Sequence, residues 1–308
     1  MRHGLAIALL ATAAFAAPAS PPDSAERQRA RVLERGLARA EAELVAGLDL
    51  VETRPTWENP WIVRSEFYEV RCTASRFVTT KIGRDLDFMA REFGKLLGVE
   101  VQPQQPFQIW IHPTIELYNQ DANAGNADEH SSFFGSYYAG DRSGRYVSTY
   151  YEPNLTLLGM HATHSACHQF VASTFETELP TWVSEGLASY FTLFWDWNWG
   201  LERFRRQAGG AGWISLERLT ASGLSDYLPN GDSRLIELGV LFHYLLHYRE
   251  ETRIPGEGDA APVASFREYL HAVVTGGDAD ETDFRYWLED QGGVAALEAD
   301  FRAFDGGN

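Results

Sequence analysis

The chain has few positive charges, few cysteines and no long apolar run beyond its first residues. It carries 26 lysine and arginine side chains against 43 aspartate and glutamate side chains, which gives a formal net charge of −17. A surface of that sign repels phosphate backbones, anionic lipids and anionic wall polymers, which argues against nucleic acid or such polymers as electrostatic partners. No later stretch approaches the roughly 18 uninterrupted apolar residues that a membrane span needs.

Only two cysteines occur, Cys72 and Cys167. An exported chain could join them in a disulfide. Cys167 also directly precedes His168, a candidate metal ligand, but successive residues of a helix point about 100° apart. We therefore expect Cys167 to be a buried structural thiol or a disulfide partner, and not a ligand.

The first residues are typical of a secretory signal. A short basic start is followed by an apolar run from Leu5 to Ala17 and by Ala-x-Ala cleavage sites that end at Ala16 and Ala19. We expect residues 1–19 to be a signal peptide and the protein to be exported, periplasmic or extracellular. After cleavage no membrane segment would remain; the alternative is an uncleaved N-terminal anchor.

The rest of the chain reads as one globular core with helical additions. Hydrophobic residues make up 44% of the sequence and aromatic residues 13%, which excludes a disordered chain. We divide the chain into an N-terminal amphipathic helix and linker (20–60), a main domain (61–250), a linker (251–262) and C-terminal helices packed on the core (263–308).

Strands precede helices along the chain, which predicts an α+β fold. An Asn/Ala/Gly/Asp-rich stretch at 121–135 is expected to be a long loop. The expected strands cover 65–71, 107–111, 135–139 and 145–151, and the expected helices cover 24–50, 75–97, 154–174, 181–195, 233–248, 262–274 and 283–304.

A pair of histidines in the second half of the chain has the spacing of a metal site. His164 and His168 would lie about 40° and about 6 Å apart on a helix, so both imidazoles can reach one ion. Such a pair alone is weak evidence for a metal site, because His243 and His247 have the same spacing. We expect one of those two to be a packing residue and the other to be exposed. Glu185, on the following helix, completes a three-ligand set that predicts zinc.

These motifs resemble those of the gluzincin, or peptidase MA-like, zinc metallopeptidases. The nearest likeness is a bacterial domain family of unknown function with the motifs H-E-x-x-H-Q and P-x-W-x-x-E-G-L-A-x-Y-F. The resemblance implies a zincin-like fold over about 63–250: a small mixed sheet with an antiparallel edge strand beside a cleft, then a mostly helical half. That edge strand would be 145–151. The matching residues are His164, His168, Gln169, Pro180, Trp182, Glu185, Gly186, Leu187, Ala188, Tyr190 and Phe191.

The chain departs from this pattern at Ser165, where the family has the glutamate that polarises the zinc-bound water. Serine is no base at neutral pH, and loss of a general base costs about 10²–10⁴ in rate. Zinc alone still lowers the pKa of its water to about 7. Glu152 is the nearest candidate for a substitute carboxylate, so hydrolysis stays open.

Further residues are candidates for the wall of such a site. His161 precedes His164 by one turn on the same face, and is a ligand, a pocket residue or a polar residue near the helix start. Tyr150 and Tyr151 lie on the strand expected at the edge and would line the cleft or pack away from it.

Three functions follow from these patterns. The first is a secreted zinc-binding protein with reduced or lost peptidase activity that binds a peptide or protein. The second is an active zinc peptidase that uses another carboxylate or zinc hydroxide alone. The third is a carbohydrate- or wall-binding module built on Trp195, Trp197 and Trp199, which otherwise pack at helix ends.

Overall fold

The computed structural model describes eleven segments of the chain. The expected signal peptide, the helix expected at 24–50 and the linker at 251–262 lie outside them. The described residues are 59–73, 75–103, 105–121, 136–139, 146–175, 179–208, 213–221, 231–248, 265–277, 283–290 and 292–304. Among the helices in these segments, none is long and apolar enough to cross a membrane.

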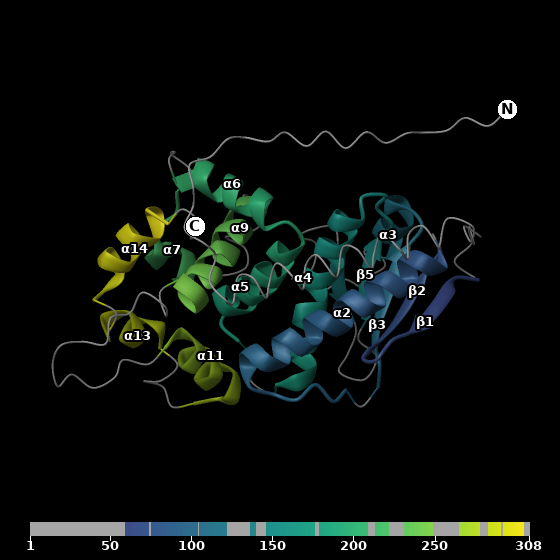
Figure 1. Cartoon of the computed structure of the whole chain (residues 1–308), viewed down its shortest axis with the longest axis horizontal. Helices are drawn as coiled ribbons and strands as arrows, with labels where there is room; N and C mark the ends of the chain where they lie inside the picture. Colours follow the sequence, from purple (N-terminus) through teal and green to yellow (C-terminus); the bar gives the residue numbers. More distant parts are fainter. Residues whose placement is uncertain are drawn as a thin grey trace, which may run out of the picture. The chain divides into compact units, whose positions relative to one another are not determined.

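The described strands form one mixed sheet, in the order β1-β2-β3-β5-β4. The three inner strands run parallel to one another, and the strand at each edge is antiparallel to its neighbour (Figure 1). This confirms the α+β class and the antiparallel edge strand. The strands are β1 (Trp61–Arg64), β2 (Tyr68–Cys72), β3 (Phe107–His112), β4 (Ser136–Ala139) and β5 (Tyr146–Tyr150).

The prediction that 145–151 forms the edge was wrong. β5 pairs with β3 on one side and with β4 on the other, so it lies inside the sheet. β4 takes the edge position. Alternating side chains predicted both strands, but pairing order depends on contacts distant in sequence, which alternation does not encode.

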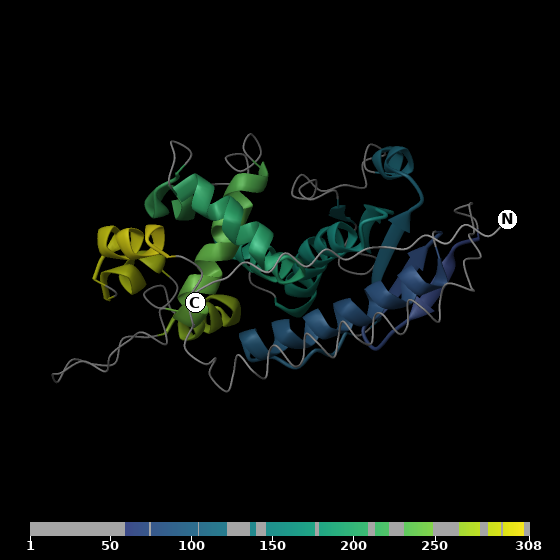
Figure 2. The same ribbon diagram turned by 45° about the horizontal axis from the view of Figure 1, so that its top comes forward.

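Helix α2 (Arg76–Leu97) crosses the sheet and confirms the predicted helix in this region (Figure 2). The side chain of Ser75 accepts a hydrogen bond from the backbone N–H of Val78, and Gly98 ends the helix in the left-handed conformation at φ 70°. Asp87, in the middle of α2, accepts hydrogen bonds from the backbone N–H groups of Glu66 and Phe67, both at 2.9 Å.

The hydrogen bonds of Asp87 explain why the strand expected at 65–71, which is β2, begins later than predicted. Because the N–H groups of Glu66 and Phe67 bond to α2, they do not join a sheet ladder, and β2 begins only at Tyr68. The alternation from Ser65 onward indicated a strand, but a single buried carboxylate holds the first residues in a turn. β1, before this turn, was not predicted.

Helix α5 (Thr181–Thr192) packs against both α4 (Leu155–Thr174) and α9 (Gly231–His243). α4 begins where the Asn154 side chain caps its first turn, and α5 begins directly after Pro180. Gly186 of α5 permits a close approach, because a Cβ atom there would lie 2.1 Å from the ring of Phe242 on α9. The absence of a side chain at Gly186 therefore sets the distance between α5 and α9.

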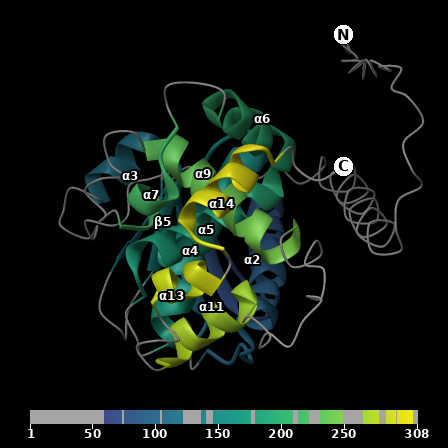
Figure 3. The ribbon, with the colours of Figure 1, turned by 90° about the vertical axis from the view of Figure 1, so that its left-hand side faces the viewer.

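The C-terminal helices belong to the same compact unit as the sheet. They are labelled α11, α13 and α14 in Figure 3. The ring of Trp182 on α5 lies 4.4 Å from that of Phe284. The expected single helix at 283–304 is two helices, because Gly292 and Gly293 adopt positive φ values of 94° and 88°. The remaining helices are α3 (Ile115–Asp121), η3 (Leu193–Trp195), α6 (Trp197–Ala208), α7 (Leu216–Ala221), the π-helix η5 (Tyr244–Tyr248), α11 (Phe266–Thr275), α13 (Phe284–Asp290) and α14 (Val294–Arg302).

Glu237 of α9 is a buried acid in this helical half, with 1% of its surface exposed. Burial raises its pKa to about 8, and Glu298 adds to the rise, whereas Arg234 and the backbone N–H of Ile214 oppose it. The carboxyl group is therefore protonated in the folded protein at pH 7.

We predict that replacing Gly186 with alanine destabilises the fold. The new methyl group overlaps the Phe242 ring, and overpacking of this kind costs about 1–3 kcal/mol. The free energy of unfolding, measured by urea denaturation, should fall by that amount. The double variant Gly186→Ala/Phe242→Leu should recover part of the loss; an unchanged midpoint in Gly186→Ala alone would contradict the close approach.

We predict that Glu237→Gln stabilises the protein in alkaline solution. A folded-state pKa of about 8 lies above the usual value of 4.5. The wild type therefore keeps the full contribution of this group below pH 4.5 and loses it as the pH rises through 8. The variant has no such loss, so its melting temperature should exceed that of the wild type at pH 9, with a smaller difference at pH 5. A difference that grows as the pH falls would contradict the assignment.

Candidate metal centre

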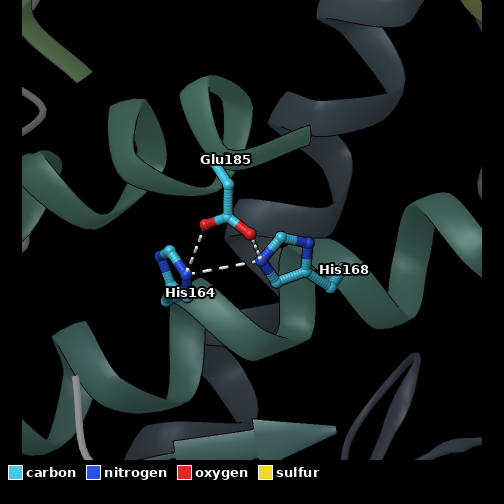
Figure 4. Close-up of side chains that lie close together, drawn as sticks. All are labelled: His164, His168 and Glu185. Carbon is cyan, nitrogen blue, oxygen red and sulfur yellow. Dashed lines mark hydrogen bonds and ion pairs between the residues drawn. The ribbon is translucent and has the colours of Figure 1, made fainter. Parts of the chain in front are cut away.

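Three side chains from two helices converge at one point (Figure 4). His164 and His168 lie one turn apart on α4, and Glu185 comes from α5. The two imidazole Nε2 atoms are 3.3 Å apart. Nε2 of His164 lies 3.4 Å from one carboxylate oxygen of Glu185, and Nε2 of His168 lies 3.6 Å from the other. With one donor atom from each residue, all three atoms lie within 4.8 Å of one another.

The separation of the two imidazole nitrogens matches an edge of a zinc coordination tetrahedron. Donor atoms at 2.0–2.2 Å from a zinc ion, at tetrahedral angles, lie about 3.3–3.6 Å from each other. The Nε2–Nε2 distance of 3.3 Å falls in that interval. Each imidazole faces a different oxygen of Glu185, at 3.4 and 3.6 Å, so the carboxylate presents both of its oxygens to the point where a cation would lie.

The surroundings of the three donors are nearly dry. Glu185 is 3% exposed and His164 is 2% exposed, whereas the side chain of His168 is 16% exposed. A buried ionised carboxylate is costly unless a positive charge compensates it. The partial exposure of His168 leaves one side of the group less enclosed than the rest.

Electrostatics favour the ligand forms of these residues. Burial by itself would raise the pKa of Glu185, but its interactions with His168 and His164 outweigh burial and hold that pKa below its usual value. Burial lowers the pKa of His164, against the opposing effect of Glu185. The group at neutral pH therefore combines a carboxylate with a neutral imidazole, which is the protonation state that a divalent metal needs.

Ser184 orients one of the ligands, and the sequence analysis did not identify it. Its Oγ lies 3.1 Å from Nδ1 of His168. For Nε2 of His168 to bind a metal, Nδ1 must carry the ring proton, and it would then donate that proton to Ser184. The only sequence signal was its position, directly before Glu185.

Ser165, which stands where the H-E-x-x-H motif has a glutamate, carries no charge. Ser165 follows His164 on α4 and is 1% exposed. Glu152, the proposed substitute, lies before α4, where it accepts a 3.5 Å hydrogen bond from the backbone N–H of Asn154. The cluster of potential metal ligands found among the described residues does not contain Glu152.

His161 and Tyr150 lie together beside the metal ligands. Their ring centroids are 5.6 Å apart. Burial, with a further contribution from His164, lowers the pKa of His161 to about 4, so this imidazole is neutral at pH 7. Tyr151 instead packs against the hydrophobic core. Of the two tyrosines considered, Tyr150 is the one that borders His161.

The second histidine pair has packing contacts. Nε2 of His247 lies 2.7 Å from the Tyr190 hydroxyl, and the centroid of the His243 ring lies 4.1 Å from that of Trp197, with the two rings tilted. Neither histidine belongs to the ligand cluster of the described residues. One of them was expected to be exposed, but both are half-buried against aromatic rings, His243 against Trp197 and His247 against Tyr190.

Both cysteines are buried free thiols. Burial raises the pKa of Cys167, and Glu185 raises it further, so the thiol stays protonated. A protonated thiol is not a metal ligand. This agrees with the expectation that Cys167 is a structural thiol, and the disulfide alternative is not observed.

Comparison with known proteins adds no family to this geometry. A scan against protein-family models finds no match, and a search of curated proteins finds no similar sequence. The metal-ligand cluster therefore stands on its own residues.

We predict that Ser184→Ala weakens zinc binding by about 10- to 100-fold, the usual effect of removing a group that orients a ligand. Competition with a fluorescent chelator would measure the dissociation constant. Ser184→Thr keeps the hydroxyl and should bind zinc like the wild type. Equal weakening in both variants would show that Ser184 acts only through packing.

Proposed function

We propose that the protein binds one zinc ion through His164, His168 and Glu185, on a frame similar to that of peptidase MA-like proteins. In this proposal its hydrolytic activity is reduced or lost. The observation that carries it is the convergence of two Nε2 atoms, 3.3 Å apart, on the two oxygens of a carboxylate that is 3% exposed.

The donor set suits zinc and excludes a preference for calcium or magnesium. Two imidazoles and one carboxylate are the protein ligands of a familiar class of catalytic zinc site. Calcium and magnesium prefer oxygen donors throughout, which two histidines do not provide. Three protein ligands also leave a fourth tetrahedral position for water or another ligand.

The residues around the ion limit the chemistry. Bound zinc would polarise a carbonyl group and lower the pKa of its water to about 7. Ser165 has no charge with which to take the proton from that water. His161 has a pKa of about 4 and is therefore a weak base at neutral pH. These features support reduced hydrolysis more than full peptidase activity.

The proposal includes export and a polypeptide partner. The support for export is the signal-like segment at 1–19. The support for a peptide or protein ligand is the resemblance of the motifs to those of metallopeptidases. A protein that keeps the ligands without the base would hold such a chain by metal and surface contacts and cleave it slowly or not at all.

We predict one zinc per chain in protein purified without added metal or a histidine tag, measured by elemental mass spectrometry. His168→Gln should lose the metal, because it removes one of the three ligands. Full zinc retention in this variant would show that the ion binds elsewhere.

We predict that Ser165→Glu gains hydrolysis of casein, an unstructured substrate, by about 10²–10⁴ over the wild type, because it restores a general base. Ser165→Gln has the same size without the charge and should gain nothing. Adding His168→Gln to Ser165→Glu should abolish the gain. Zinc-dependent hydrolysis by the wild type at a rate that Ser165→Glu does not raise would contradict the reduced-activity proposal.

A further inference from the structure

A cavity of about 370 Å³ lies along one face of α6, away from the three metal ligands in the sequence. α6 is labelled in Figures 1 and 3. Among the described residues the cavity is lined by Trp199, Arg203, Arg206 and Gln207. These positions recur at one-turn intervals and therefore form one stripe of the helix. The volume is in the range of small-molecule sites.

The stripe is held by packing on the opposite side of α6. Gly200, Leu201 and Phe204 are buried there, and a Cβ atom at Gly200 would lie 2.3 Å from Leu193. The helix start is fixed as well, because the Asp196 carboxylate accepts a 3.0 Å hydrogen bond from the backbone N–H of Trp199. The cavity wall is therefore a rigid element.

The wall combines positive charge with an aromatic face. The guanidinium of Arg203 lies over the Trp199 ring, 5.1 Å from its centroid. Arg206 has its Nη2 atom 3.7 Å from the Glu202 carboxylate, but both side chains are mostly exposed, at 67% and 72%. A pair so exposed is weak, so Arg206 can exchange Glu202 for another anion.

Gln207 contributes a buried acceptor. Its Oε1 atom is shielded from solvent and has no hydrogen-bond partner within the described part of the chain. A buried carbonyl oxygen without a donor is costly, and a ligand that brings an O–H or N–H group would remove that cost. A ligand complementary to this stripe would therefore combine an anionic group, a flat face and a hydrogen-bond donor.

We propose that this cavity binds a uronic acid residue of an acidic saccharide. The sugar carboxylate would pair with the guanidinium of Arg206, the ring face would lie against Trp199, and a hydroxyl would donate to Oε1 of Gln207. An aromatic carboxylate would lack that donor. Because the whole chain carries a net charge of −17, an anion needs such a local positive site to bind at all.

All three tryptophans of the sequence cluster are partly buried against the hydrophobic core. Nε1–H of Trp195 also donates to the Thr163 hydroxyl at 2.8 Å, and Trp197 packs at a tilt against His243. Trp199 is the member of that cluster that lines the cavity. This assignment is independent of the zinc proposal, because it uses none of the metal ligands.

The test is titration of the full protein with tri-galacturonic acid, followed by calorimetry and by tryptophan fluorescence. Arg206→Gln should weaken binding about tenfold or more, the effect of losing one charge-assisted hydrogen bond. Trp199→Leu should weaken it as well. Arg205→Gln, on the same helix but outside the cavity wall, is the charge-matched control and should bind within about twofold of the wild type.

Neutral maltotriose should bind at least about tenfold more weakly than the acidic trisaccharide, since it cannot pair with Arg206. Three results would overturn the proposal: no saturable binding, equal weakening in Arg206→Gln and Arg205→Gln, or equal affinity for the neutral sugar. Zinc content measured on the same samples separates a failure of this site from a failure of the metal site.

Discussion

The contact between the Glu185 carboxylate and two imidazoles of α4 is the constraint that organises this protein. An ionised carboxylate with 3% exposure is stable only beside positive charge, which a cation held between Glu185, His164 and His168 would supply. The contact joins α5 to α4. The absence of a side chain at Gly186 then lets α9 close against α5. Two successive residues of α5, Glu185 and Gly186, thus face α4 and α9, respectively.

The remainder of the fold supports the two ligand-bearing helices. α4 lies against β5 and α2, and the side chain of Gln169 donates to the carbonyl of Gln108 on β3 at 3.4 Å. The C-terminal helices reach α5 through Trp182. Because zinc would bind the folded arrangement and not the open chain, metal affinity would also contribute to stability. The α6 stripe includes none of these residues, so ligand binding there can be tested separately from metal binding.

Features set by neighbouring residues were predicted correctly from the sequence, whereas contacts between distant segments were not. The helix expected at 75–97 matches α2, whose ends are set by local caps at Ser75 and Gly98. The spacing of His164 and His168 correctly brought these two side chains together, because helix geometry fixes it. Two features depend on how separate elements meet. They are the position of β4, and not β5, at the sheet edge, and the contact of Ser184 with His168. No periodicity within one segment carries that information. Gly292 and Gly293 were visible in sequence, but their positive φ values decide that the tail breaks there.

Ser165 separates the question of metal binding from that of catalysis, since it provides no base beside three residues that could hold a metal ion. The most direct measurement is a crystal of the zinc-loaded protein with diffraction recorded on both sides of the zinc absorption edge. The account predicts one anomalous peak at about 2.0–2.2 Å from Nε2 of His164, Nε2 of His168 and a carboxylate oxygen of Glu185. A peak at another site, or none at full zinc loading, would contradict it.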